Sequence, residues 1–338
     1  MIHGMSARRE RSHLWRLGVL LLVVVYFIQI DNLMKVRPDH AFLSLLIVAL
    51  VLRNARRFLA DWSPFIALWI AYDFMRGAVD DLAGSIHILE PYRLEQILFG
   101  WMGAGRIPSF AILEWRIRMS GSTLTGALDA AASSFYAMHM AAPLVLAWVF
   151  WHTLRDRPAY FRFTIAFSIT TWVSFATYFA YPAAPPWYVR DFGFIQPEAA
   201  FKGAGAGNLV ATDRWIGFPL FESVYRHLNP NKFAAIPSLH SAFPLLILIH
   251  AWRRFRRRAL PVAIYPAGVW ASAVYLNHHY VIDIAIAVLY VLGATWVTDR
   301  VVYPRLFRRG PFRRWVDPGK GKGGRSPGIP GAAGAPAR

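Results

Sequence analysis

The sequence predicts an all-α polytopic membrane protein, and three observations on composition lead to this fold class. Of the 338 residues, 56% are hydrophobic and 15% are aromatic, whereas only 17% are charged. Soluble domains carry about 25% charged residues, and here the charged residues lie between long apolar runs. Separately from the fold class, the absence of cysteine excludes disulfides and thiolate metal sites.

The net charge of +18 does not indicate a nucleic-acid partner. The basic side chains flank apolar segments, where they set membrane topology and contact anionic lipid. We therefore expect a membrane as partner and no nucleic acid. The sequence carries no signal for an oligomeric state.

Eight apolar segments are candidates for membrane-spanning helices, which need about 20 apolar residues. They are residues 14–30, 36–52, 62–75, 127–151, 161–181, 239–252, 260–276 and 280–297. The second has an uninterrupted apolar part of only residues 41–52, so a re-entrant segment is an alternative there. No small-residue cleavage site follows the first, which we expect to be retained. Residues 77–126 alternate short apolar pieces with charges, which favours interfacial helices.

Clusters of arginine at alternate loops predict the orientation of these spans. Cytoplasmic loops carry an excess of basic residues, so eight spans with both termini in the cytoplasm are expected. The sixth and eighth spans then begin on the extracytoplasmic side. We expect two extra spans in residues 1–60, a catalytic membrane core in 61–300 with outer loops 77–126 and 182–237, and a basic, disordered cytoplasmic tail in 301–338.

Two histidines and one aspartate at the predicted outer side can perform phosphoryl transfer. His279 and Asp283 are four residues apart, so they share one face of a helix. The carboxylate can hold one imidazole nitrogen and leave the other nucleophilic. His240, at the start of the sixth span, can act as the acid and base.

Other interpretations of these three residues remain open at this point. They could be polar helix ends satisfied by loop backbone, or two histidines and one aspartate could bind zinc. Because no further ligand is indicated, we expect no metal and no cofactor.

Seven residues are candidates for binding substrate. Ser238 is a potential N-cap whose helix amides could attract phosphate, and the cations of the outer loop could neutralise a phosphodiester. Arg76 could equally form a structural ion pair with Asp73 instead of binding phosphate. His139 could equally be a hydrogen-bonded core residue instead of a ligand. The full set is Ser238, Lys232, Arg214, Arg76, His139, Asn277 and Trp187.

Four motifs in the chain resemble those of the type-2 phosphatidic acid phosphatase superfamily, in the branch that contains the inositol phosphorylceramide synthases. They are Tyr-Ala-Met-His-Met-Ala-Ala-Pro at 136–143, Tyr-Pro-Ala-Ala-Pro-Pro-Trp at 181–187, Ala-Ile-Pro-Ser-Leu-His-Ser-Ala at 235–242 and His-Tyr-Val-Ile-Asp at 279–283. The resemblance implies a six-helix core without a metal. It also implies His279 as nucleophile, Asp283 as its orienting carboxylate and His240 as the acid and base.

The chain departs from the phosphatases of this superfamily at their phosphate-binding cations. The Lys-x6-Arg-Pro motif is missing, and Ala273 stands where the phosphatases have an arginine. These departures favour a transferase over a phosphatase. Ala287 replaces the glycine usual in the synthase branch, which concerns helix packing rather than chemistry.

The resemblance leads to one principal functional hypothesis. The enzyme would move a phosphorylated head group, phosphoinositol from phosphatidylinositol, to a hydroxyl of a lipid or glycolipid acceptor through a phosphohistidine on His279. The phospholipid donor and the acceptor would meet at the outer membrane face. Two alternatives remain: a lipid phosphate or polyprenyl diphosphate phosphatase with water as acceptor, and a non-catalytic lipid transporter or scaffold.

Overall fold

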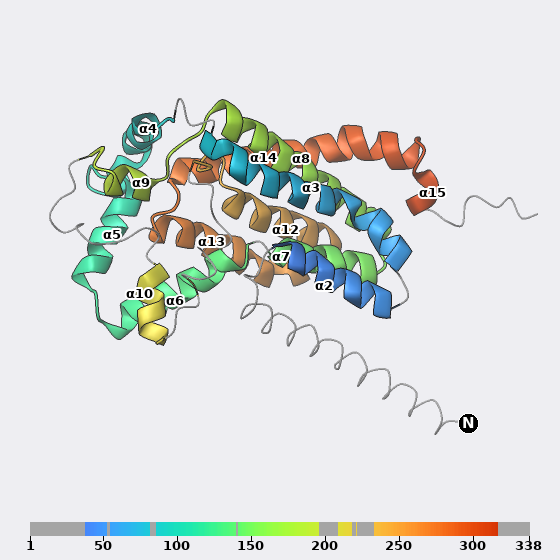
Figure 1. Ribbon diagram of the computed structural model, residues 1–338, viewed down its shortest axis with the longest axis horizontal. Helices are drawn as coiled ribbons and strands as arrows, with labels where there is room; N and C mark the ends of the chain where they lie inside the picture. Colours follow the sequence, from blue (N-terminus) through green and yellow to red (C-terminus); the bar gives the residue numbers. More distant parts are fainter. Residues whose placement is uncertain are drawn as a thin grey trace, which may run out of the picture.

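A computed structural model describes residues 38–52, 55–81, 86–139, 141–195, 209–217, 221 and 233–316. The predicted span 14–30, Lys232 and residues 317–338 of the predicted tail lie outside the described residues. The described chain forms an elongated helical bundle (Figure 1). The main helices of the bundle are α2 (Pro38–Val51), α3 (Ala55–Asp81), α8 (Arg157–Ala180), α12 (Leu239–Phe255), α13 (Ile264–Tyr275) and α14 (Val281–Val297).

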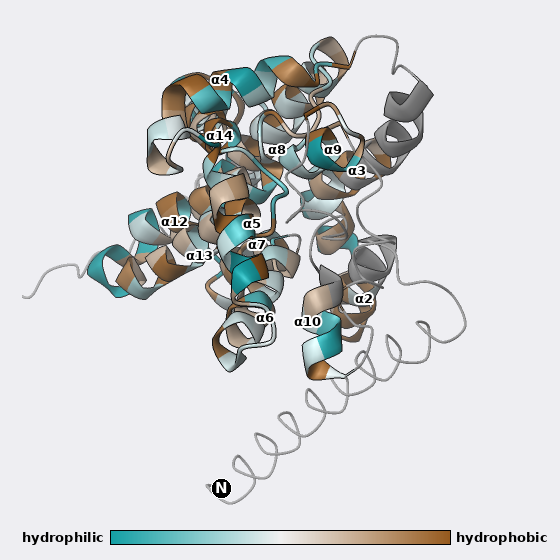
Figure 2. Ribbon diagram, turned by 90° about the vertical axis from the view of Figure 1, so that its left-hand side faces the viewer, coloured by the Kyte–Doolittle hydropathy of each residue, from teal (hydrophilic) through white to brown (hydrophobic). Residues whose placement is uncertain are grey.

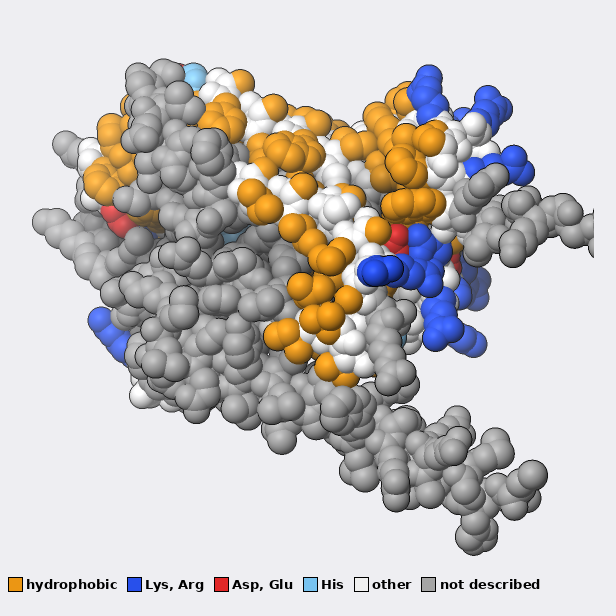
Figure 3. Space-filling model, turned by 45° about the vertical axis from the view of Figure 1, so that its right-hand side comes forward, with side chains coloured by type: hydrophobic (Ala, Val, Ile, Leu, Met, Phe, Trp, Pro, Cys, Tyr) orange, Lys and Arg blue, Asp and Glu red, His pale blue; other side chains and the backbone are white. Residues whose placement is uncertain are grey.

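An aromatic core holds the long helices together. Trp62 of α3 packs against Tyr160 of α8, and Phe65 of α3 packs against Phe163 and Phe167 of α8. Phe167 in turn contacts Phe243 of α12 at a ring distance of 4.5 Å. Between helices in a membrane, close packing of such rings stabilises the fold through van der Waals contacts rather than through removal of apolar surface from water. Figure 3 shows hydrophobic side chains over the middle of the molecule and Lys and Arg side chains at one end.

The length and hydropathy of the helices support the predicted class of all-α membrane protein. The number of eight spans stays a prediction. Within the described residues, the helices Arg157–Ala180 and Val281–Arg308 are long and apolar enough to cross a membrane. A third span results if the bent pair Thr123–Ala137 and Ala141–Thr153 is counted as one. The chain is thus an all-α protein with apolar helices suited to a membrane.

The predicted span 127–151 is not one straight helix. It consists of α6 (Thr123–Ala137) and α7 (Ala141–Trp148) with its extension η3 (Val149–Thr153), bent by 55° between them. Pro143 explains the bend, because proline has no N–H and its ring clashes with the carbonyl four residues earlier, that of His139. The break places His139 at a helix end.

The final long helix extends beyond residue 301, where the tail was expected to begin. It continues from α14 through η6 (Thr298–Val302) and η7 (Pro304–Arg308), followed by α15 (Arg313–Val316). Asp299 on this extension forms ion pairs of 2.7 Å with Arg162 and 2.8 Å with Arg253. These contacts attach the extension to α8 and α12, so residues up to 316 belong to the folded part.

Short helices cover one end of the bundle. They are α4 (Leu89–Phe99), η2 (Gly100–Met102), α5 (Pro108–Arg118), α9 (Pro186–Asp191) and α10 (Leu209–Ile216) (Figure 1). Those within residues 77–126 lie where interfacial helices were predicted, whereas those within residues 182–237 lie in a segment that was expected to be an outer loop. On α4, Ile97 is 78% exposed whereas Glu95 is fully buried. Figure 2 shows hydrophobic and hydrophilic colours on this helix. An exposed apolar face of this kind is typical of a helix that lies in a membrane surface.

Candidate active site

The first turn of α12 is held by its N-cap and by two neighbouring elements. The Ser238 hydroxyl accepts a hydrogen bond from the Ser241 amide (3.2 Å), as expected of an N-cap. The Ser238 amide donates to the backbone carbonyl of Asp283 (3.3 Å), and the Tyr178 hydroxyl donates to the carbonyl of Pro237 (2.6 Å). Because of these contacts, His240 is fixed beside the start of α14.

The start of α14 is held by two carboxylates. Asp283 accepts a hydrogen bond from the Tyr280 amide at 2.9 Å. Glu95 of α4 accepts hydrogen bonds from the amides of Val281 (2.9 Å) and Ile282 (3.0 Å). The first amides of a helix have no partner within the helix, and negative charge is favourable there. Sequence reasoning missed Glu95, since nothing local indicates a partner 186 residues away.

His240, His279 and Asp283 form a continuous chain of hydrogen bonds. His279 Nδ1 lies 3.1 Å from Asp283 Oδ2, and His279 Nε2 lies 3.1 Å from His240 Nδ1. His279 is 4% exposed and Asp283 is fully buried. The Nδ1–H of His279 donates a hydrogen bond to the Asp283 carboxylate, which leaves Nε2 with a lone pair that accepts a hydrogen bond from His240 Nδ1–H. The Nε2 atom is therefore the potential nucleophile.

Two further residues of α6 and the following turn surround His240. The Tyr136 ring stacks on His240 at 4.2 Å and 14°, and the His139 ring lies 3.9 Å from it. His139 Nδ1 is 2.6 Å from the Tyr136 carbonyl, which can only accept, so this nitrogen donates. The Tyr136 hydroxyl lies 3.3 Å from His278 Nδ1. We call His139, His240, His278 and His279 the histidine cluster.

Asn277 and Trp187 lie next to the histidine cluster. The Trp187 amide donates to the Asn277 carbonyl at 3.2 Å, which joins α9 to the loop before His279. Asn277 has a φ of +66°, a conformation that asparagine tolerates better than most residues. Its side chain is fully buried. Among the described residues, neither its Oδ1 nor its Nδ2 has a hydrogen-bond partner.

Of the three predicted cations, only the side chain of Arg214 is among the described residues. Arg214 is exposed on α10, which packs against α6. Arg76 lies on α3, but its side chain is not among those described, and Lys232 lies outside the described residues. Their predicted roles stay predictions. Ala273 and Ala287, at the two positions that depart from the related motifs, are 0% and 1% exposed and belong to packed helices.

Glu95 lies on α4, outside the apolar helices, and the pKa of its carboxyl is shifted. Burial raises the pKa of its carboxyl from 4.5 to about 7, and the charge of Asp283 also raises it, whereas the two amide hydrogen bonds lower it. Within the described residues, no group of three or more His, Cys, Asp or Glu side chains could hold a metal ion.

Comparison with known proteins identifies the family of this arrangement. Residues 106–297, more than half of the chain, match the PAP2 superfamily. The chain belongs to the PAP2 superfamily. This confirms the resemblance drawn from the four motifs, and it makes the chain a membrane enzyme of the lipid phosphotransferase and phosphatase class.

The curated relatives lie in the synthase branch of this superfamily. The phosphoinositol dihydroceramide synthase of Bacteroides thetaiotaomicron is 29% identical over 281 residues, which cover 80% of this chain and 87% of the relative. The inositol phosphorylceramide synthase of Candida albicans is 29% identical over 193 residues, 56% of this chain and 40% of the relative. The catalytic subunit AUR1 of Saccharomyces cerevisiae is 29% identical over 104 residues, 31% of this chain and 25% of the relative. The chain thus spans less than half of these two fungal relatives. No solved structure matches it.

Proposed function

We propose that the protein transfers a phosphorylated head group from a phospholipid to a lipid hydroxyl through a phosphohistidine. The observation that carries this proposal is the hydrogen-bonded chain from Asp283 through His279 to His240. It orients one imidazole by a buried carboxylate and leaves its second nitrogen available, as nucleophilic catalysis requires. The second imidazole stands within reach of the same atom.

In the first half of the proposed reaction, His279 Nε2 attacks the phosphorus of the donor. A P–N bond forms, and the P–O bond to diacylglycerol breaks. His240, in its protonated state, donates its proton to the departing oxygen. Asp283 stabilises the positive charge that the phosphorylated imidazole carries.

In the second half, an acceptor hydroxyl attacks the phosphohistidine. His240, now neutral, takes the hydroxyl proton as the P–O bond to the acceptor forms and the P–N bond breaks. This step returns His279 and His240 to their starting protonation states. Water in place of the acceptor would give hydrolysis, the phosphatase alternative.

The neighbouring polar groups are proposed to bind the head group. The buried amide of Asn277 is without a hydrogen-bond partner among the described residues, a condition that costs about 1–3 kcal/mol per group unless a ligand supplies the partner. His139 lies against His240, and because its Nδ1 donates to the Tyr136 carbonyl, its neutral ring can accept a hydrogen bond through Nε2. Ser238 and Trp187 hold the two loops that face the cluster. The exposed position of Arg214 gives its predicted role no support.

The name of the Bacteroides relative suggests the donor head group. It is a phosphoinositol dihydroceramide synthase that matches most of both chains. We propose phosphoinositol as the transferred group, phosphatidylinositol as the donor and a ceramide-type lipid or glycolipid as acceptor. The arginine-rich helix ends favour a cytoplasmic location for that end of the bundle and an extracytoplasmic location for the histidine cluster.

The direct test is transfer by the purified protein in vesicles that contain phosphatidylinositol labelled in its inositol ring. We expect the label to move to an added dihydroceramide or to an extracted glycolipid, with one diacylglycerol released per transfer. The variant His279→Ala should lose both products. Label recovered solely as water-soluble inositol phosphate would show hydrolysis and overturn the transferase assignment.

A further inference from the structure

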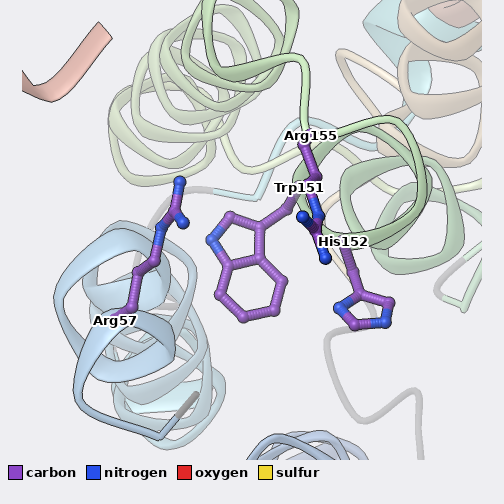
Figure 4. Close-up of a pocket in the computed structure, with 4 residues that line it drawn as sticks. All are labelled: Arg57, Trp151, His152 and Arg155. Carbon is purple, nitrogen blue, oxygen red and sulfur yellow. The ribbon is translucent and has the colours of Figure 1, made fainter. Parts of the chain in front are cut away.

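A pocket of about 160 Å³ opens at the end of the bundle that is remote from the histidine cluster. It is lined by Arg57 of α3, Trp151 and His152 of η3, and Arg155 of the turn before α8. Figure 4 shows the Trp151 indole between the side chains of Arg57 and His152. The proposed transfer reaction does not use any of these four residues.

Helix α8 extends from the pocket to the histidine cluster, so its length gives the distance between them. It begins at Arg157, two residues after Arg155, and Tyr178 near its other end contacts the loop before His240. Its 24 residues span about 36 Å at 1.5 Å per residue, close to the ~30 Å thickness of a hydrocarbon core. The pocket and the histidine cluster therefore lie at opposite membrane surfaces.

The pocket retains positive charge after its ion pairs are counted. Asp61 is bound at 2.8 Å by both terminal nitrogens of Arg157 and at 2.7 Å by the Trp151 indole nitrogen. Arg57 approaches the same carboxylate only to 3.6 Å and is half exposed. Asp61 thus contacts the guanidinium groups of Arg57 and Arg157, and the charge of Arg155 has no carboxylate partner among the described residues.

The rim of the pocket continues onto an apolar helix face. Trp148 and His152 are in contact, with ring centroids 5.0 Å apart. Val145 lies one turn before Trp148 and is 62% exposed. Residues three and four apart share one face of a helix, so this surface leads from the pocket along α7. A ligand with a phosphate in the pocket can place an acyl chain on this face.

We propose that the pocket binds the phosphate group of an anionic phospholipid in the leaflet opposite the histidine cluster. Guanidinium groups bind phosphate through two parallel hydrogen bonds. A volume of about 160 Å³ corresponds to roughly five water molecules, which suits a phosphate and part of its ester but not an acyl chain. Free phosphate would use the same charges but not the apolar face, so we assign a lipid.

The test measures binding of phosphatidylglycerol to the full chain in phosphatidylcholine nanodiscs by native mass spectrometry. Arg155 has a φ of +52°, a conformation in which asparagine is tolerated. Arg155→Asn should therefore fold while it removes one guanidinium. We expect an affinity for phosphatidylglycerol at least about tenfold weaker, because charge-assisted hydrogen bonds between guanidinium and phosphate are among the strong ones. Arg155→Lys should recover part of the loss.

Two controls distinguish this site from a general attraction of the arginine-rich end. Arg258 is exposed on η5 (Arg256–Ala263) at the same end and does not line the pocket. If Arg258→Gln weakens the affinity for phosphatidylglycerol as much as Arg155→Asn does, the proposal is overturned. Displacement of phosphatidylglycerol by millimolar inorganic phosphate would overturn the lipid assignment. An unchanged melting temperature of Arg155→Asn in pure phosphatidylcholine shows that the variant is folded.

Discussion

Replacement of Glu95 by alanine tests how the start of α14 is held in place for chemistry. The Glu95 carboxylate accepts the amides of Val281 and Ile282, which directly follow the His279–Tyr280 pair. Each such bond to a charged acceptor contributes about 1.5–3 kcal/mol, and an unpaired buried amide costs about 1–3 kcal/mol. The alanine variant therefore weakens the local structure by about 2–6 kcal/mol. If misorientation of His279 raises the activation free energy of transfer by about 2 kcal/mol of this amount, kcat falls about 30-fold.

The assay is transfer of labelled head group at saturating donor, with kcat and KM determined separately. Glu95→Ala should lower kcat about 30-fold or more and change KM less, because Glu95 is not expected to contact substrate. Glu95→Gln keeps one acceptor oxygen, so its kcat should fall only about three- to tenfold. The matched control is Glu90→Gln, an exposed carboxylate on the same helix, which should behave like the unmodified protein. Activity of a folded Glu95→Ala within twofold of the unmodified protein would refute this reasoning.

The remaining predictions concern the pH dependence and the proposed chemistry. The pKa of Glu95 is raised to about 7 in the folded state, so folding takes up a proton between about pH 4.5 and 7. Stability then falls as pH rises through this window, and Glu95→Gln should reduce that slope in melting curves. Asp283→Asn should lower kcat about 100-fold or more, because the amide can favour the wrong tautomer of His279; an unchanged rate in a folded variant would contradict its orienting role. Acid-labile label trapped on the protein should vanish in His279→Ala, whereas His240→Ala should mainly slow turnover; label retained in His279→Ala would place the intermediate elsewhere. Asn277→Gly keeps the backbone conformation and should raise KM several-fold without lowering the melting temperature, because it removes an unpartnered buried amide; an unchanged KM would show that the amide does not bind substrate.

Motifs and local periodicity predicted much of the site, because its central residues lie at the starts of two apolar helices. The spacing of His279 and Asp283 predicted that both lie on one face of a helix. The structure joins them at 3.1 Å, but His279 precedes Tyr280, the N-cap of α14, so the contact is made across the helix start rather than along a helix face. Ser238 as an N-cap was also readable from the chain alone, and the structure shows this cap. The bend at His139 was missed, although Pro143 was a signal for it.

Long-range contacts account for what could not be predicted. Glu95 looked like one charge among many in a mixed segment, and only the fold brings it to α14. Similarly, Asp299 pairs with arginines of α8 and α12 and keeps residues after 301 in a helix. The basic composition of that segment predicted a disordered tail. This prediction missed the helix, because composition does not show which distant groups form ion pairs with the segment.

The sequence by itself determined the class of protein, the superfamily and the two helix starts that carry His240, His279 and Asp283. These properties depend on apolar segment length and on residue spacing, which are local. Only the tertiary structure decided that His240 Nδ1 meets His279 Nε2, that Glu95 holds the start of α14, and that the arginine pocket lies at the opposite end of α8 from the histidine cluster. Those contacts join residues far apart in the chain, and their geometry follows from how the helices pack.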